Sequence, residues 1–174
     1  MNADRSRYNS PTVTKRRYDS PLGPLIIAAQ GGAVVGLWFV GQAYYGMLPR
    51  GLAPLNASPA AEEAVLTEAE VWLDRYFCGV DPGRPPLLCL AGTTFQNAVW
   101  QLLAEIPRGK VRTYSEMAAT LGSSARAVGG AIARNPISLM IPCHRVIGAG
   151  GQLTGYAGGV DRKARRRALE PPRG

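Results

Sequence analysis

The chain has 174 residues, 46% of them hydrophobic, and a formal net charge of +8. That length allows one domain, or two small ones, with a buried core. No apolar run approaches the ~20 residues of a membrane helix and no signal-peptide core is present, so we expect a cytoplasmic protein without membrane segments. Three cysteines without a Cys-x-x-Cys pair and a single histidine argue against a disulfide framework and a metal site, and we expect no cofactor.

The positive charge is concentrated at the two ends of the sequence. Residues 1–17 carry five Lys or Arg against one acidic residue, residues 18–106 carry three against eight, and residues 107–174 carry twelve against three. A basic segment of this kind favours a polyanionic partner, with DNA or RNA the leading candidates. The alternative is a basic face that is simply exposed to solvent. Nucleic acid is preferred only because the candidate reactive residues, described below, lie in the same basic segment.

The N-terminal half predicts a structural domain. Residues 1–16 are polar, basic and without periodicity, which is typical of a disordered arm. Segments 18–24, 25–29 and 33–40 predict a small antiparallel sheet with a hairpin turn at 30–32, and residues 41–59 predict a loop. Residues 60–77 predict an amphipathic helix that covers the sheet through Val65, Leu66, Ala69, Trp72, Leu73 and Tyr76. The Gly- and Pro-rich residues 79–86 predict a linker that closes this domain, 17–86.

Residues 87–174 predict a second, mostly helical domain. Thr93 with Gln96, and Thr113 with Glu116, have the spacing of capping boxes, and Ser124 is a further N-cap before a helix that runs to about Arg134. Two short helices joined by a tight turn predict a helix-turn-helix, which docks one helix in a DNA groove, although an ordinary helical hairpin fits the pattern equally well. The expected fold class is therefore α+β.

The second of these helices carries almost no side chains, since it consists largely of Ala125, Ala127, Gly129, Gly130, Ala131 and Ala133. Each glycine inside a helix costs ~1 kcal/mol relative to alanine. We expect something to approach its backbone closely, either another helix or a DNA backbone. Arg126 projects from this smooth surface.

The tetrapeptide Pro142-Cys143-His144-Arg145 carries the candidate chemistry. Its histidine is the only one in the chain, so any step that needs an imidazole must use His144. Cys143 is the candidate nucleophile, because a thiol needs a base and a positive environment to react. Adjacent side chains point apart, so proton transfer between the two needs a bridging water. Cys78 and Cys89 are expected to be inert, buried thiols.

Four ordered motifs indicate a family. They are Arg126-Ala127-Val128-Gly129-Gly130-Ala131, Asn135-Pro136, Ile141-Pro142-Cys143-His144-Arg145-Val146-Ile147-Gly148 and Leu153-Thr154-Gly155-Tyr156-Ala157-Gly158-Gly159. Over about the last 80 residues the chain resembles the O6-alkylguanine-DNA alkyltransferases. The resemblance implies DNA repair by stoichiometric, irreversible transfer of an alkyl group from O6-alkylguanine to Cys143, and it leaves O4-alkylthymine open as a second substrate. The implied partner is double-stranded DNA with alkylated bases, and we expect a monomer.

The resemblance also implies residue roles. His144 takes the thiol proton through water, Glu170 orients His144, and Tyr114 assists the departing guanine. Asn135 matches a hinge residue that ties the recognition helix to the Cys143 segment; its alternative role is to cap that helix. Arg126 enters the duplex, and its neighbours Ala127, Gly129 and Gly130 contact DNA. The flipped base is expected in a pocket lined by Tyr114, Ile132, Val146, Tyr156, Ala157 and Gly158.

Two features depart from the family pattern. The connector between Tyr114 and Arg126 is two residues shorter than usual. Arg165, Arg166 and Arg167 stand where the C-terminal helix normally offers apolar residues, and we expect arginine stems to cover apolar surface there.

Three rival functions belong to other classes. A protein that flags damage without repairing it lacks a counterpart of Cys143, a Cys-His hydrolase needs an ester or amide site for which there is no motif, and a DNA-binding regulator needs no reactive thiol.

Overall fold

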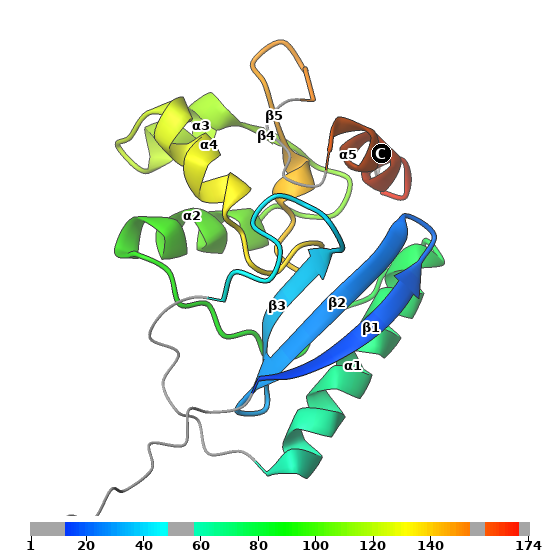
Figure 1. Ribbon diagram of the computed structural model, residues 1–174. Helices are drawn as coiled ribbons and strands as arrows, with labels where there is room; N and C mark the ends of the chain where they lie inside the picture. Colours follow the sequence, from blue (N-terminus) through cyan, green and yellow to red (C-terminus); the bar gives the residue numbers. More distant parts are fainter. Residues whose placement is uncertain (1–12, 49–57, 154–158, 171–174) are drawn as a thin grey trace, which may run out of the picture.

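The N-terminal part is a three-stranded antiparallel sheet. In the computed structural model, which describes residues 13–48, 58–153 and 159–170, strands β1 (Thr14–Ser20), β2 (Gly23–Gln30) and β3 (Ala33–Phe39) lie side by side in chain order (Figure 1). The β2–β3 turn uses Gly31 and Gly32, which both have positive φ, a region that favours glycine.

Strand β1 begins earlier than the sequence predicts. The assignment of residues 14–16 to a disordered arm is wrong, because Thr14, Lys15 and Arg16 pair with β2. Residues of β1 alternate between exposed and half-buried positions. An edge strand with one solvated face tolerates polar residues, so these residues lack the apolar pattern from which a strand is predicted. Arg16 also forms ion pairs with glutamates of the covering helix. Residues 1–12 of the expected arm lie outside the described residues.

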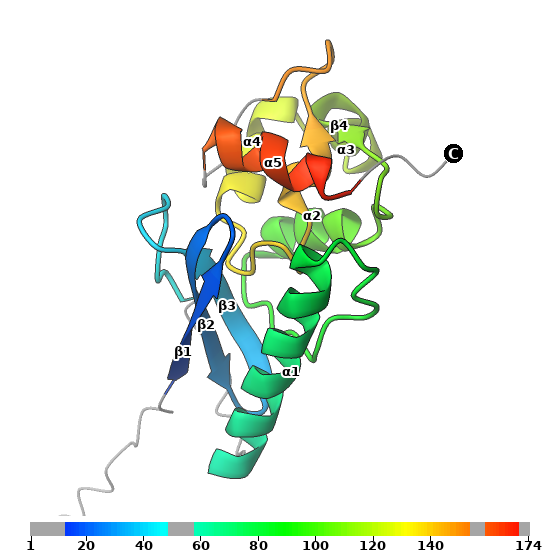
Figure 2. The same ribbon diagram turned by 90° about the vertical axis from the view of Figure 1, so that its right-hand side faces the viewer.

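Helix α1 (Pro59–Phe77) covers one face of the sheet, as Figure 2 shows. Ser58 caps its N-terminus by accepting a hydrogen bond from the Ala61 amide. The six residues predicted for its apolar face are buried. Glu62 accepts a hydrogen bond from the Gly31 amide, so the helix also stabilises the β2–β3 turn.

The C-terminal part contains the remaining elements. They are α2 (Thr94–Ala104), β4 (Arg112–Thr113), α3 (Tyr114–Thr120), α4 (Ala125–Ala133), the 3-10 helix η1 (Cys143–Arg145), β5 (Val146–Ile147) and α5 (Val160–Ala168). The capping boxes at Thr93 and Thr113 and the Ser124 cap are confirmed. Strands β4 and β5 pair in parallel, a contact that the sequence pattern does not reveal. The expected α+β fold class is confirmed.

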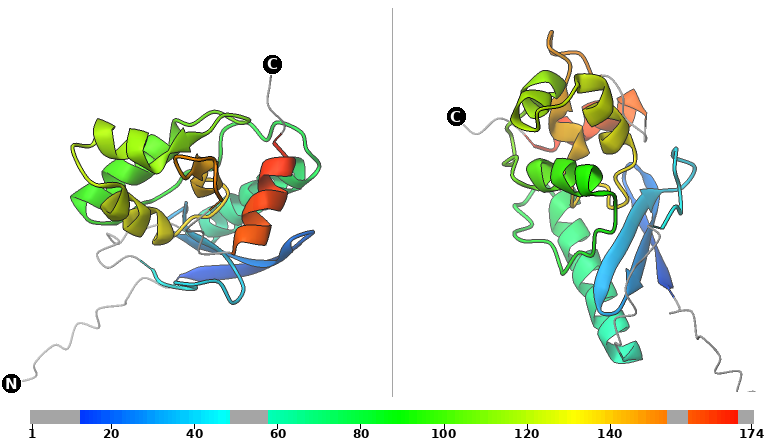
Figure 3. Two further views of the ribbon diagram at one scale, coloured as in Figure 1. Left: turned by 90° about the horizontal axis from the view of Figure 1, so that it is seen from above. Right: turned by 90° about the vertical axis from the view of Figure 1, so that its left-hand side faces the viewer.

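The two parts are joined through the free edge of β3. The Val34 amide donates to the Leu87 carbonyl at 2.8 Å, and the Leu37 amide donates to the Pro136 carbonyl at 2.9 Å. One hydrophobic cluster then runs from the sheet and α1 into α2, α3 and α4. Seen from above, α5 crosses over the end of the sheet (Figure 3). The segment that leads to Cys143 is therefore attached directly to the sheet edge.

No helix in the described part of the chain combines the length and the apolar character needed to cross a membrane.

Candidate active site

The segment between α4 and η1 positions Cys143. Residues 137–141 are buried. Asn135 holds this segment through both ends of its amide: Nδ2 donates to the Ile141 carbonyl at 2.9 Å, and Oδ1 accepts from the Ile137 amide at 3.0 Å. Leu139, inside this turn, has a φ of 73°, a left-handed conformation that costs energy for a leucine. Asn135 thus fixes the geometry of the turn between α4 and the thiol.

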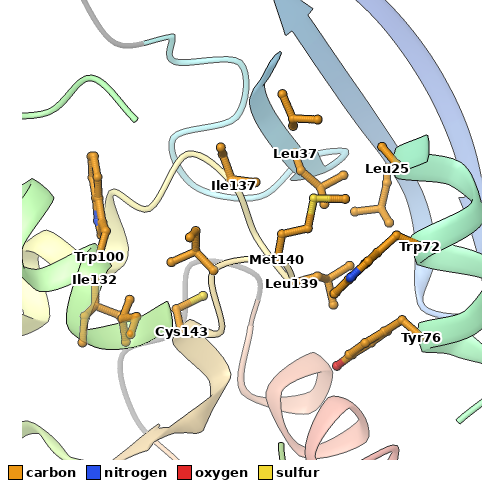
Figure 4. Packing of buried hydrophobic residues seen from close by; sticks show 14 of the residues in the cluster. Leu25, Leu37, Trp72, Tyr76, Trp100, Ile132, Ile137, Leu139, Met140 and Cys143 are labelled. Carbon is orange, nitrogen blue, oxygen red and sulfur yellow. The ribbon is translucent and has the colours of Figure 1, made fainter. Parts of the chain in front are cut away.

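Cys143 opens η1 and is 4% exposed. Figure 4 shows its sulfur beside Ile132, with Leu139 and Met140 on the other side. The expectation of a buried thiol is wrong for Cys78, which is exposed because it is the C-cap of α1 and lies outside the buried stripe of that helix. Cys89 is only half-buried. All three cysteines are free.

His144 and Glu170 form a buried pair. The Nε2 atom of His144 lies 2.9 Å from Oε1 of Glu170, and the His144 side chain is 0% exposed. Since a carboxylate only accepts, the imidazole carries its proton on Nε2 and Nδ1 has a free lone pair. Nδ1 has no hydrogen-bond partner among the described residues. The imidazole is therefore set up to accept a proton on Nδ1.

Burial, followed by the charge of Arg166, lowers the pKa of His144 to about 3. Burial alone would raise the pKa of Glu170, but hydrogen bonds from His144 and Arg145 lower that pKa below its usual range. Arg145 donates a hydrogen bond to each oxygen of the carboxylate, at 2.8 Å from Nε to Oε2 and 2.9 Å from Nη2 to Oε1. At neutral pH the pair therefore consists of a neutral imidazole and an ionised carboxylate.

Helix α5 docks in spite of its arginine run. Arg162 and Arg166 lie over the Phe39 ring, with Cζ at 4.9 Å and 5.8 Å from its centroid. Arg166 is fully buried, so the expectation that arginine stems cover apolar surface is confirmed for this residue, whereas Arg165 is exposed. Arg108 holds the end of the helix by donating to the Leu169 carbonyl at 2.7 Å. These contacts keep Glu170 at the imidazole.

Tyr114 lies at the start of α3 next to a lysine that the sequence analysis missed. Nζ of Lys163 donates to the Tyr114 hydroxyl oxygen at 3.5 Å and lies 5.6 Å from its ring centroid. Burial raises the pKa of Tyr114 to about 12 and lowers that of Lys163 to about 8. Lys163, Arg166 and Glu170 recur at helical spacing along α5, and this periodicity was the signal that could have identified Lys163.

The smooth surface of α4 is open to solvent. Arg126 and Ala127 are exposed, and Gly129 and Gly130 are partly exposed. A Cβ atom added at Gly129 would lie 3.8 Å from Cε1 of Tyr114, and one at Gly130 would lie 3.5 Å from Nη1 of Arg134. Both are ordinary contact distances. Packing within the described part of the protein therefore does not require either glycine.

Besides Tyr114, two of the other five predicted pocket residues belong to the described part of the chain. Ile132 and Val146 are buried in the same hydrophobic cluster as Cys143. Tyr156, Ala157 and Gly158 lie outside the described residues. A separate surface hollow of about 460 Å³, lined by Trp38, Tyr44 and Arg134 among others, includes none of the predicted site residues. Within the described ranges, no group of three or more His, Cys, Asp or Glu side chains is arranged to hold a metal ion.

Comparison with known proteins relates most of the chain to one group of DNA-repair proteins. The family model described as 6-O-methylguanine DNA methyltransferase, DNA binding domain, matches residues 94–171. A methylated-DNA–protein-cysteine methyltransferase of Mycobacterium leprae is 45% identical over 157 residues, which cover 89% of this chain and 90% of that protein. A protein of the same name from Methanosarcina acetivorans is 42% identical over 148 residues, covering 84% and 90%.

Solved structures extend the similarity to the sheet. The crystal structure of Mycobacterium tuberculosis OGT in complex with DNA has a TM-score of 0.70 and 38% identity, and the match covers 91% of this chain and 94% of that one. The R37L variant of the M. tuberculosis O6-methylguanine methyltransferase has a TM-score of 0.71, with 38% identity and coverage of 94% and 95%. The similarity therefore includes the N-terminal part as well as the segment around Cys143.

Proposed function

Because the chain belongs to the methylated-DNA–protein-cysteine methyltransferases, we propose that Cys143 is the cysteine that receives the alkyl group. The chain repairs DNA by alkyl transfer to a cysteine. Of the three thiols, Cys143 alone is adjacent to the single histidine of the chain, and that histidine is paired with a buried carboxylate. This pairing is the observation that carries the proposal.

Proton removal from the thiol is assigned to His144. The neutral imidazole accepts the Cys143 proton on Nδ1 through a bridging water, and Glu170 stabilises the imidazolium that forms, since its carboxylate already holds the Nε2 proton. Arg145 keeps that carboxylate ionised and in place. The support is the 2.9 Å contact between Nε2 and Oε1 and the absence of a partner for Nδ1 among the described residues.

The thiolate then attacks the alkyl carbon of O6-alkylguanine. A carbon–sulfur bond forms as the carbon–oxygen bond breaks, and guanine leaves with the electron pair. Tyr114 supplies a proton or hydrogen bond to the leaving purine, and the ammonium of Lys163 stabilises the phenol oxygen from 3.5 Å. The product is a thioether, which water does not hydrolyse, so each chain repairs one base. O4-alkylthymine offers the same chemistry and is a second candidate substrate.

DNA is proposed to bind on α4, with α3 and α4 acting as a helix-turn-helix. Duplex DNA meets the exposed backbone around Ala127, Gly129 and Gly130, while Arg126 fills the gap that a flipped nucleotide leaves. The support is that both glycines cost helix stability and that no packing contact within the described residues requires them. The pocket for the flipped base is proposed to consist of Tyr114, Ile132 and Val146 with Tyr156, Ala157 and Gly158. The protein is proposed to act as a monomer in the cytoplasm.

Mass spectrometry tests the assignment of the nucleophile. The protein is mixed with a duplex oligonucleotide that carries one O6-methylguanine, digested, and the three cysteine-containing peptides are weighed. We expect one methyl group per chain, on the Cys143 peptide alone. Cys143→Ser should leave the lesion unrepaired, whereas Cys89→Ser, the matched control, should repair it normally. Methylation of another peptide, or repair by Cys143→Ser, would refute the assignment.

A further inference from the structure

Tyr76 brings a hydroxyl group from the N-terminal part to the imidazole of His144. It lies in the last turn of α1, its side chain is fully buried, and its oxygen is 3.5 Å from Nε2 of His144. The two residues are 68 positions apart in the chain. Figure 4 shows the Tyr76 ring pointing from α1 toward α5, with the hydroxyl at its far end.

Aromatic neighbours hold the Tyr76 ring in place. Trp72 stacks on it, with centroids 5.4 Å apart and an interplanar angle of 11°. Phe77 meets it edge-on at 5.3 Å and 89°, and the His144 ring meets it at 6.4 Å and 81°. Because the ring is confined in this way, the hydroxyl oxygen has a fixed position and only its proton is free to rotate.

The position of the hydroxyl determines where the protons lie. The Nε2 proton of His144 points to Oε1 of Glu170, so the Tyr76 hydroxyl has to turn its own proton away from Nε2. Nε2 then faces two oxygen atoms, one from a carboxylate and one from a phenol. The carboxylate can only accept, and the hydroxyl oxygen accepts when its own proton is turned away, so in this arrangement both stabilise a proton on Nε2. Moving the proton to Nδ1 would leave the Nε2 lone pair facing a carboxylate, which is repulsive.

A purely structural role explains this arrangement less well. A phenylalanine would fill the same aromatic cluster without burying a hydroxyl, and the adjacent position in the cluster is indeed Phe77. A buried hydroxyl costs free energy unless it makes polar contacts. The polar groups that face it come from three elements, namely His144 of η1, Glu170 after α5 and Arg166 of α5.

We propose that Tyr76 is a positioning residue for alkyl transfer, whose hydroxyl acts with Glu170 to keep the His144 proton on Nε2 and so leaves Nδ1 to accept the Cys143 proton. This inference rests on the proposed roles of Cys143 and His144. It assigns to the N-terminal part a share in the chemistry beyond support of the fold. The raised pKa of Tyr76, about 12 because of burial, agrees with a phenol that stays protonated throughout.

The single histidine makes a direct test possible. In protein labelled with ¹⁵N-histidine and purified without a histidine tag, every imidazole signal comes from His144. We expect the wild-type spectrum at neutral pH to show the tautomer protonated on Nε2. A wild-type imidazole protonated on Nδ1 would overturn the proposal without the need for any variant.

Removal of the hydroxyl provides the second test. Tyr76→Phe should lower the single-turnover rate constant for methyl transfer about five- to tenfold, the usual effect of one lost hydrogen bond, and should shift the His144 nitrogen signals toward the other tautomer. Affinity for duplex DNA should not change. Tyr18→Phe is the matched control, because that hydroxyl also contacts α1, at 2.7 Å from Asp74, but does not contact His144.

The outcomes separate this inference from the function on which it rests. If wild-type protein does not methylate Cys143, the proposed function fails. If wild-type protein transfers normally while Tyr76→Phe matches it in rate and in tautomer, only the role of Tyr76 fails. A loss of rate shared by Tyr76→Phe and Tyr18→Phe also contradicts the proposal, since it would reflect a general effect on α1.

Discussion

Nε2 of His144 lies 2.9 Å from Oε1 of Glu170 across a separation of 26 residues, and Arg145 binds both oxygens of the same carboxylate. A histidine and a carboxylate are thus buried side by side, and a half-buried arginine binds the carboxylate. Such a group is stable only while its charges stay matched, because an uncompensated charge in the interior is costly. Its protonation states therefore link the chemistry of the site to the stability of the fold.

Acid should destabilise the folded protein. The pKa of His144 is lowered to about 3 by burial and by Arg166, against 6.5 for an ordinary histidine. Between these values the unfolded chain binds a proton that the folded protein does not, so stability that is present above pH 6.5 declines as the pH falls toward 3. The lowered pKa of Glu170 also makes the folded protein less stable as the pH falls below about 4.5, the ordinary pKa of a glutamate.

Denaturant titrations from pH 8 to pH 5 would measure this effect. His144→Gln removes the titrating group, and its free energy of unfolding should vary less between pH 6.5 and pH 5 than that of the wild type. Equal slopes for the two proteins in this interval would show that the imidazole is not protected from protonation in the folded state.

Asn135→Ala should reduce both stability and transfer. The substitution removes two buried hydrogen bonds, to the Ile137 amide and the Ile141 carbonyl, and leaves their partners unsatisfied at a cost of roughly 1–3 kcal/mol each. The turn before Cys143 then loosens, and we expect the rate constant for methyl transfer to fall at least tenfold at a temperature where the variant is folded.

Asn97→Ala is the control for this prediction. Its side chain makes the same two kinds of bond, to the amide and the carbonyl of Gly92, but it lies in α2 away from the thiol. It should lose stability and keep its transfer rate. A normal transfer rate in folded Asn135→Ala would mean that the amide does not position the nucleophile.

Gly129→Ala and Gly130→Ala should change stability and DNA affinity in opposite directions. An alanine is better than a glycine inside a helix by ~1 kcal/mol, and the added methyl group meets only ordinary contacts in the protein. The same methyl group would separate α4 from a DNA backbone. Thermal melts should rise while duplex binding weakens.

Ala64→Gly, on the exposed face of α1, measures the free-energy difference between alanine and glycine in a helix of this protein. It should lower the free energy of unfolding by a similar amount without a change in DNA affinity. If both glycine variants bind duplex DNA as tightly as the wild type, the DNA backbone does not approach α4 at these positions.

Arg126→Ala should slow methyl transfer from duplex DNA without slowing methyl transfer from a free base. Arg126 is exposed and its proposed role is to fill the space left in the duplex, so transfer from a free O6-alkylguanine base should be nearly unchanged. Transfer from the same base in a duplex should slow by tenfold or more, because nothing fills the space left in the stack. Single-turnover rates with the two substrates would measure this.

Arg75→Ala, an exposed arginine on α1, is the charge-matched control and should affect neither rate. Equal slowing of both substrates by Arg126→Ala would place the arginine in the alkyl-transfer chemistry, contrary to the role proposed for it.

Several features of this protein follow from its sequence because they depend on neighbours a few residues apart. The caps at Thr93, Thr113 and Ser124 are local hydrogen bonds, and the buried face of α1 follows from helical periodicity. The thiol and the single histidine are adjacent in the chain. The division into residues 17–86 and 87–174 remains a prediction, since one hydrophobic cluster spans both parts.

Other features exist only in the folded chain. The contact of Tyr76 with His144, the burial of Lys163 and Arg166, and the pairing of β4 with β5 all join residues far apart in sequence. A tyrosine in an apolar stripe and an arginine in a basic run look the same in sequence whether they face the core, the imidazole of His144 or solvent. Their environment is decided by how α1 and α5 pack around η1, because burial and electrostatic interaction depend on distance in space and not on distance along the chain.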